Sequence, residues 1–119
     1  MSEEQITVLI ADDEVRITEL IKDFLNASGY NALVAYDGEE ALKIFNEHSE
    51  ISLVILDIMM PEMDGWQVCR EIRKTSNKPV ILLTARAEEF DQLMGFESGA
   101  DDYVTQPFSH AVLVKRIEA

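Results

Sequence analysis

The segment VLIADD at residues 8–13, together with LVILD at residues 53–57, decides the fold predicted for this chain. Each is a continuous apolar run that ends in acidic residues, as expected of a strand buried on both faces of a parallel sheet. If the two strands are neighbours, their carboxyl ends meet in the crevice where open α/β sheets bind ligands. Asp12, Asp13 and Asp57 should then converge, and three such charges repel one another unless some are protonated or a cation joins them.

Five short, largely β-branched runs alternate with five segments of helical period along the chain. This alternation predicts a doubly wound, flavodoxin-like α/β fold with one parallel five-stranded sheet. The second and fifth runs are short and mixed, so we expect them at the sheet edges, and right-handed crossovers then give the strand order 2-1-3-4-5. The expected strands cover residues 6–11, 32–35, 53–56, 80–84 and 103–105.

Two of the helical segments carry apolar residues at the spacing of one helix face. We expect both stripes to face the sheet, which makes the cysteine in the second stripe a small buried residue. A glycine at position 29 follows the first helical segment, where a left-handed residue ends a helix. The stripes consist of Ile17, Leu20, Ile21 and Phe24, and of Gly65, Val68, Cys69 and Ile72.

Composition limits the class of protein. The chain has 119 residues, 47% of them hydrophobic, which predicts one domain over residues 1–119. Its formal net charge of −13 argues against direct binding to nucleic acid or to an anionic membrane. Cys69 is the single cysteine, the start MSEEQ is acidic where a secretory signal would be basic, and no apolar stretch approaches the roughly 20 residues of a membrane span. We therefore expect a cytoplasmic protein.

The three acidic residues predict metal and phosphoryl chemistry. Hard carboxylate oxygens suit Mg²⁺, which typically takes one or two protein carboxylates and a phosphate group. Asp57 ends the central strand and is the candidate nucleophile toward phosphorus, with Asp12 and Asp13 as candidate metal ligands. Simpler roles stay open, because Asp12 and Asp13 could only cap the following helix and Asp57 could only form a turn before Pro61.

Two further polar side chains are expected at the same rim. Thr84 ends the fourth expected strand and Gln106 follows the fifth, which would bring a hydroxyl and an amide to the acidic crevice. Threonine is also an ordinary strand residue, so Thr84 alone decides little. Convergence at four strand ends favours a shared role over four separate structural ones.

Several motifs resemble a known family. They are DD at residues 12–13, LDIMMP at 56–61 with MDG at 63–65, LTAR at 83–86, and GADDYVT at 99–105 before PF at 107–108. In combination they resemble the receiver domain of two-component response regulators, over essentially the whole chain. The stretch ARAEEFD at residues 85–91 and the last helix are most similar to the subfamily with a C-terminal winged-helix DNA-binding domain.

The resemblance implies a role for each acidic residue. Asp57 would accept a phosphoryl group from a sensor histidine kinase. Asp13, Asp57 and the backbone carbonyl of Met59 would ligate Mg²⁺, while Asp12 would act largely through water. The chain would then be a signalling switch that regulates transcription through a further domain.

The resemblance also implies how the signal would travel. Thr84 would hydrogen-bond the phosphoryl group and move inward, and Tyr103 would rotate into the vacated space. The fourth helix, fifth strand and fifth helix would carry the output surface. Gln106 departs from the family pattern, which has lysine there, so one charged contact to the phosphoryl group is missing and we expect weaker switching.

A homodimer through this output surface is a further expectation. Leu93, Ala111 and Val112 either form an exposed dimer patch or belong to the core, the commoner place for apolar residues on helices. Asp102 could pair with Arg116 across the same interface.

Two other functions fit the sequence less well. A phosphatase of the haloacid dehalogenase type would need a second acid two residues after its nucleophile, where this chain has Met59. A flavodoxin-like binding module would bind phosphate at the loop after the first strand, where Asp12 and Asp13 would repel it.

Overall fold

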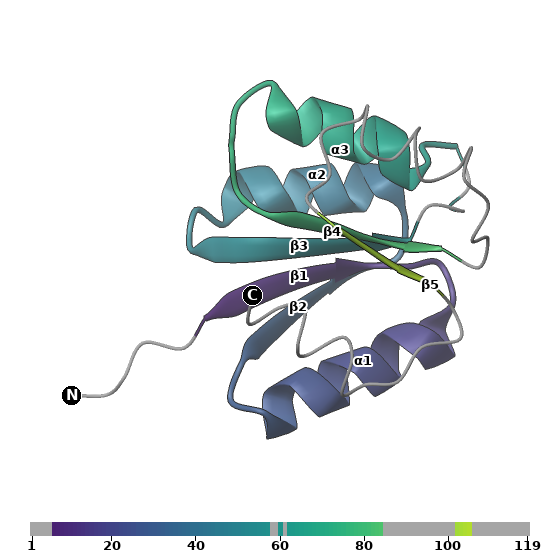
Figure 1. The fold of residues 1–119 in the computed structure, drawn as a ribbon, viewed down its shortest axis with the longest axis vertical. Coiled ribbons are helices and arrows are strands. Elements are labelled where there is room, and N and C mark those ends of the chain that lie inside the picture. The colour runs from purple at the N-terminus through teal and green to yellow at the C-terminus, as the bar shows by residue number, and fades with distance from the viewer. Residues whose placement is uncertain (1–5, 58–59, 61, 85–101, 106–119) are drawn as a thin grey trace.

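The computed structural model describes residues 6–57, 60, 62–84 and 102–105, with Thr84 and the last four described by their backbone alone. The described strands form one parallel sheet in the order β2-β1-β3-β4-β5 (Figure 1), which confirms the predicted order and both edge strands. The elements are β1 (Thr7–Ala11), α1 (Val15–Ala27), β2 (Asn31–Ala35), α2 (Gly38–Glu47), β3 (Ile51–Asp57), α3 (Gly65–Arg73), β4 (Val80–Thr84) and β5 (Asp102–Thr105).

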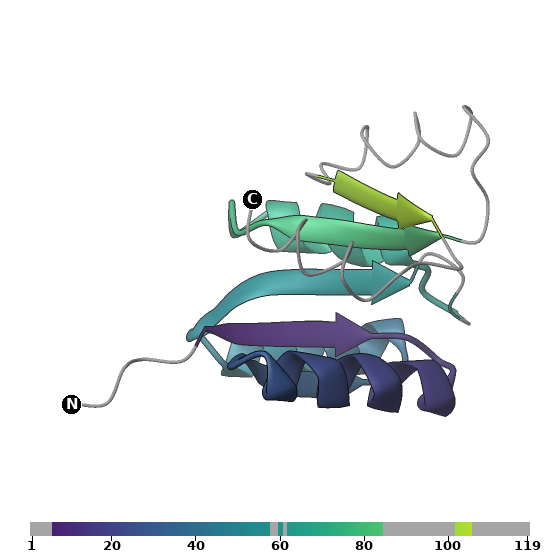
Figure 2. The same ribbon diagram turned by 60° about the horizontal axis from the view of Figure 1, so that its bottom comes forward.

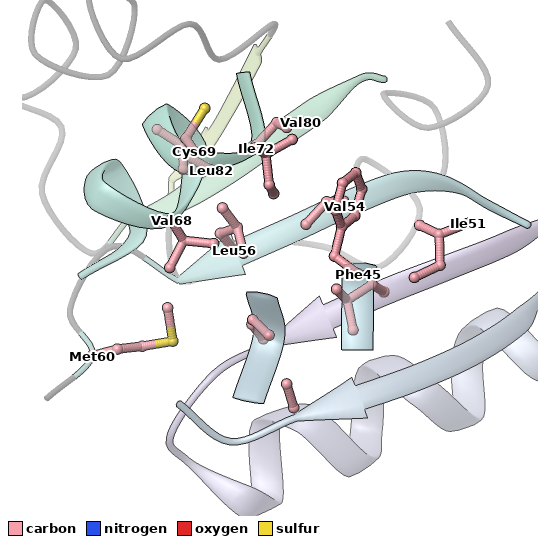
Figure 3. Packing of buried hydrophobic residues seen from close by; sticks show 14 residues of the cluster. Phe45, Ile51, Val54, Leu56, Met60, Val68, Cys69, Ile72, Val80 and Leu82 are labelled. Carbon is pink, nitrogen blue, oxygen red and sulfur yellow. The ribbon is translucent and has the colours of Figure 1, made fainter. Parts of the chain in front are cut away.

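Helices cover both faces of the sheet. Helix α1 lies on one face, and α2 and α3 lie on the other (Figure 1). Side chains of β1 alternate between the two layers, since Leu9 joins the cluster under α2 and α3 while Val8 and Ile10 join the cluster under α1. The cluster under α2 and α3 is shown in Figure 3, and it includes Cys69 of α3 and Leu82 of β4, both fully buried. Burial on both faces explains the continuously apolar strands.

One expectation about α1 is wrong. The helical pattern predicts Leu20 on the buried stripe, but its exposed fraction is 55%. The inward face of α1 instead consists of Thr18, Ile21 and Leu25, which are each at most 1% exposed. Leu20 precedes Ile21 by one residue, about 100° around the helix, and this rotation carries it to the solvent side. A polar residue, Thr18, therefore occupies a core position of this helix.

Local signals set the ends of the helices. Gly29 follows α1 with a φ of 95°, the left-handed conformation expected of a glycine that ends a helix. Asp64 caps α3 through a capping box with Gln67, with each side chain bonded to the other residue's backbone N–H at 2.9 Å. In the described part of the chain, no helix has both the length and the apolar character needed to cross a membrane.

Candidate metal and phosphoryl site

The register of the sheet brings the three acidic residues together. Ala11 of β1 is the partner of Leu56 in β3, so Asp12 and Asp57 follow two paired residues at the same end of the sheet. The arrowheads of β1, β3 and β4 point to this end in Figure 2. One carboxylate oxygen from each of Asp12, Asp13 and Asp57 lies within 4.8 Å of the others, which confirms the predicted convergence.

Burial differs among the three carboxylates. Asp12 is 1% exposed and Asp57 is 8% exposed, whereas Asp13 lies at the surface. Two full negative charges 4.8 Å apart repel by roughly 3 kcal/mol at an effective dielectric constant of about 20. This repulsion is larger than the typical stabilisation from a surface ion pair, about 0–1 kcal/mol. A bound cation would reduce the repulsion between the ionised carboxylates.

Asp12 has the hydrogen-bonding pattern of an oriented ligand. Its Oδ1 accepts the backbone N–H of Glu14 at 2.9 Å, and its own N–H donates to the carbonyl of Ala35 at 3.2 Å. Its Oδ2 is buried and has no hydrogen-bond partner in the described part of the chain. Burial raises the pKa of Asp12 above the ordinary aspartate value, and the charge of Asp13 raises it further, while the Glu14 N–H opposes the shift.

The structure argues against a purely capping role for Asp12 and Asp13. The N-cap of α1 is Glu14, whose side chain makes no capping hydrogen bond. Asp12 does hold the Glu14 N–H, but this uses only one of its two carboxylate oxygens. A buried, unpaired carboxylate oxygen beside two other carboxylates fits a hard divalent cation, because such an ion supplies the missing positive charge and accepts oxygen ligands.

Of the residues between β3 and α3, the structure describes residues 60 and 62–64. Met60 is buried, and Glu62 adopts a left-handed conformation with a φ of 67°, which is uncommon for a residue with a side chain. Gly38, the first residue of α2, lies against Met63, so closely that a Cβ on Gly38 would be 2.5 Å from the Met63 carbonyl oxygen. Met63, just before α3, is therefore packed against the start of α2.

The other predicted site residues are placed only in part. Thr84 ends β4 one residue after Leu83, the register partner of Asp57, so its backbone stands at the acidic rim. Tyr103 lies in β5 opposite Leu82. The remaining predicted residues, Met59, Gln106, Leu93, Ala111, Val112 and Arg116, lie outside the described residues, and Asp102 is placed only as the first residue of β5.

Sequence reasoning missed Thr18. Its hydroxyl lies against the backbone of Asp12, within the buried face of α1. The available signal was a polar residue at a core-facing position of the helix that directly follows the acidic pair. Ile17 and Leu20, on either side of Thr18, also fit a helical stripe, so the pattern placed them on the buried face and left Thr18 out.

Known proteins resemble the chain in sequence and in structure. Two curated relatives are a probable transcriptional regulator, ycf27, from Cyanidium caldarium and the transcriptional regulatory protein CpxR from Klebsiella pneumoniae. They are 51% and 45% identical over 112 residues, which is 94% of this chain but 45% and 47% of theirs. The chain therefore spans about half the length of these relatives.

A solved structure, the receiver domain of the Francisella response regulator 1452, superimposes with a TM-score of 0.90 at 37% identity. The match covers 96% of this chain and 94% of that one. The family model for the response regulator receiver domain matches residues 8–118. Because that match covers nearly the whole chain and the acidic cluster stands where the motifs predicted it, this chain belongs to the response regulator receiver domain family.

Proposed function

We propose that the chain is a phosphorylation-controlled switch in which Asp57 accepts a phosphoryl group from a sensor histidine kinase in a Mg²⁺-dependent reaction. The observation that carries this proposal is the cluster of three carboxylates within 4.8 Å, with one buried oxygen of Asp12 left unpaired. Membership of the receiver family supports the signalling role and makes the phosphatase and flavodoxin-like alternatives unnecessary.

Asp57 is the best nucleophile of the three. It ends the central strand β3 and is almost fully buried, so the strand fixes its backbone. Asp12 already holds the Glu14 N–H through Oδ1, and Asp13 lies at the surface. A carboxylate oxygen of Asp57 would form a bond to phosphorus while the bond from phosphorus to the donor nitrogen breaks.

Asp13 and Asp57 would ligate Mg²⁺ and Asp12 would hold it largely through water, with the backbone carbonyl of Met59 as the further ligand that the family resemblance implies. The bound ion neutralises charge on the carboxylates and on the phosphoryl oxygens. Asp13, at the surface, gives the site its opening to solvent and to a phosphodonor. Water would later hydrolyse the acyl phosphate and reset the switch.

The response to phosphorylation would pass through Thr84 at the end of β4 and Tyr103 in β5, two neighbouring strands. We infer that phosphorylation shifts the population between two conformations of the domain. The size of the shift depends on how much more strongly one conformation binds the phosphoryl group than the other. Gln106 would limit that difference, because an amide donates a hydrogen bond but supplies no charge. Output would be transcriptional, as in the longer relatives, which are transcriptional regulators. It would pass through the C-terminal winged-helix DNA-binding domain that the family resemblance implies, and dimerisation through Leu93, Ala111 and Val112 stays a prediction.

A phosphorylation experiment tests this proposal. Incubation with acetyl phosphate and MgCl₂ should add one phosphoryl group to the protein, as measured by intact mass. Asp57→Asn should abolish the addition, and excess chelator should suppress it in the unchanged protein. Asp64→Asn is the matched control, because Asp64 is an acid seven residues after Asp57 in the sequence, outside the cluster, whose capping hydrogen bond an amide oxygen can still accept. Labelling of Asp57→Asn would disprove the assignment.

A further inference from the structure

A buried hydroxyl connects helix α1 to the acidic cluster. Thr18 is 0% exposed, and its Oγ1 lies within hydrogen-bond distance of two backbone carbonyls, that of Glu14 at 2.9 Å and that of Asp12 at 3.1 Å. The hydroxyl has a single proton, which these two carbonyls share in a bifurcated hydrogen bond. The contact with Glu14, four residues back, is the ordinary habit of a threonine in a helix. The contact with Asp12, six residues back, leaves the helix and reaches the loop that carries the carboxylates.

The bond from Thr18 completes a set of three anchors around Asp12. The N–H of Asp12 donates to Ala35 of β2, the Oδ1 accepts from Glu14, and the carbonyl oxygen accepts from Thr18. The backbone N–H, the backbone carbonyl and one carboxylate oxygen of Asp12 are thus bonded to three different residues. The other carboxylate oxygen, Oδ2, is buried without a hydrogen-bond partner among the described residues, and the Asp12 carboxylate contributes one oxygen to the acidic cluster.

We propose that Thr18 is a positioning residue for the metal site, which holds the backbone of Asp12 so that its carboxylate stays directed at Asp13 and Asp57. This inference rests on the proposed function, since it assigns Thr18 to the same site. Repulsion among the three carboxylates pushes the loop outward when no cation is bound, and the Thr18 bond resists that movement. Ligands kept in place before binding lose less freedom when the metal arrives.

Removal of the hydroxyl tests the proposal. Thr18→Val keeps the branched shape and removes the donor, and Thr18→Ala removes it with a residue that favours helices. We expect the Kd for Mg²⁺ to rise about tenfold in both variants, the lower end of the range for outer-shell partners of metal ligands. The Kd is measured by titration with MgCl₂ alone, by calorimetry and by the fluorescence of Trp66, the single tryptophan of the chain and the second residue of α3. Thr18→Ser keeps a hydroxyl and should leave the Kd near the original value.

Ile21→Val is the matched control. Ile21 lies on the same buried face of α1, in the core cluster beneath that helix, and its side chain has no polar atom with which to bond the acidic loop. The positioning role would be established by a loss of Mg²⁺ affinity in the two hydroxyl-free variants, together with near-original affinity in Thr18→Ser and in Ile21→Val.

Three other results would overturn it. An unchanged Kd in Thr18→Val and Thr18→Ala would show that the bond does not position the ligand. An equal loss in Ile21→Val would mean that general loosening of α1 is the cause. If the unchanged protein bound no Mg²⁺, the metal site itself would be wrong, and that outcome is distinct from failure of the Thr18 assignment alone.

Discussion

Asp12 is subject to two opposed physical demands. Its burial, and to a smaller extent the charges of Asp13 and Glu14, favour the protonated form, which is why its pKa lies above the ordinary value. Metal binding needs the charged form. The protein keeps this carboxylate at a cost in stability, as sites that bind cations commonly do.

Asp12→Asn should therefore stabilise the metal-free protein. The pKa of Asp12 is higher in the folded protein than in the unfolded chain. As pH rises above the pKa of the unfolded chain, the unfolded state releases a proton that the folded state still holds, and this difference destabilises the folded state. At pH 7 with chelator, we expect the free energy of unfolding in urea to increase by roughly 1–2 kcal/mol. The gain should shrink as pH falls below the raised pKa of Asp12, since the native carboxyl is then already neutral.

Asp13→Asn provides the comparison for this prediction. Asp13 is exposed, so water screens its charge and its removal should stabilise the protein less than removal of the Asp12 charge. Both variants should bind Mg²⁺ more weakly. A metal-free Asp12→Asn protein that is less stable than the original at pH 7 would contradict this account of the cluster.

At the scale of single elements, the helix starts differ in a way that reflects function. Helices α2 and α3 begin with capping side chains, Asp37 and Asp64, each of which accepts a backbone N–H at the third helical position. Helix α1 has no side-chain cap at Glu14. Its first turn is instead attached to Asp12 through the Glu14 N–H and the Thr18 hydroxyl. The hydrogen bonds that fix the start of α1 are therefore the same ones that hold Asp12 of the acidic cluster in place.

Packing of α2 against the loop before α3 depends on the absence of a side chain at Gly38. In Gly38→Ala the new Cβ would be 2.5 Å from the Met63 carbonyl oxygen and 2.9 Å from the Met63 Cβ. We expect a loss of roughly 1–3 kcal/mol in the free energy of unfolding, measured in urea. Because the closest atom belongs to the backbone, Met63→Ala should not restore the stability of Gly38→Ala.

Gly29 is a control for this prediction with a different physical basis. A Cβ at Gly29 would meet nothing within 4 Å, but its φ of 95° strains any residue with a side chain. Gly29→Asn should cost less than Gly29→Ala, since asparagine tolerates left-handed backbone better. The same ordering at Gly38 would indicate that conformation, and not the contact with Met63, limits that position.

At the scale of the whole molecule, charge opposes compactness. The chain has 23 acidic and 10 basic residues, a formal net charge of −13. Self-repulsion of this kind destabilises the folded state and weakens as salt screens it. Any salt should therefore stabilise the protein, but a cation that binds the cluster should do more than screening alone.

MgCl₂ should raise the free energy of unfolding above the value in NaCl of matched ionic strength. At about ten times its Kd, a ligand that binds only the folded state adds about 1.4 kcal/mol. The excess of MgCl₂ over NaCl should largely disappear in Asp57→Asn, which removes one of the three carboxylates. Equal stabilisation by both salts would mean that the cluster does not bind the ion specifically.

The sequence by itself determined the architecture and the place of the site. Strands such as 8–11 and 53–56 are apolar without interruption because both sheet faces are covered. The hydrophobic pattern and the short length of these runs are therefore enough to identify them as strands. Once their order follows from right-handed crossovers, the carboxylates at residues 12, 13 and 57 must meet at one end of the sheet.

Only the tertiary structure decided how the site is held. A helical pattern fixes the buried face to within about one residue, or roughly 100°, so it could not show that Thr18 is buried and Leu20 exposed. The contact of Gly38 with Met63 joins segments far apart in sequence, and no local rule predicts it. No local rule predicts the hydrogen bonds of Asp12 either. In a packed interior, the partner of a polar group depends on which distant segments of the chain lie beside it.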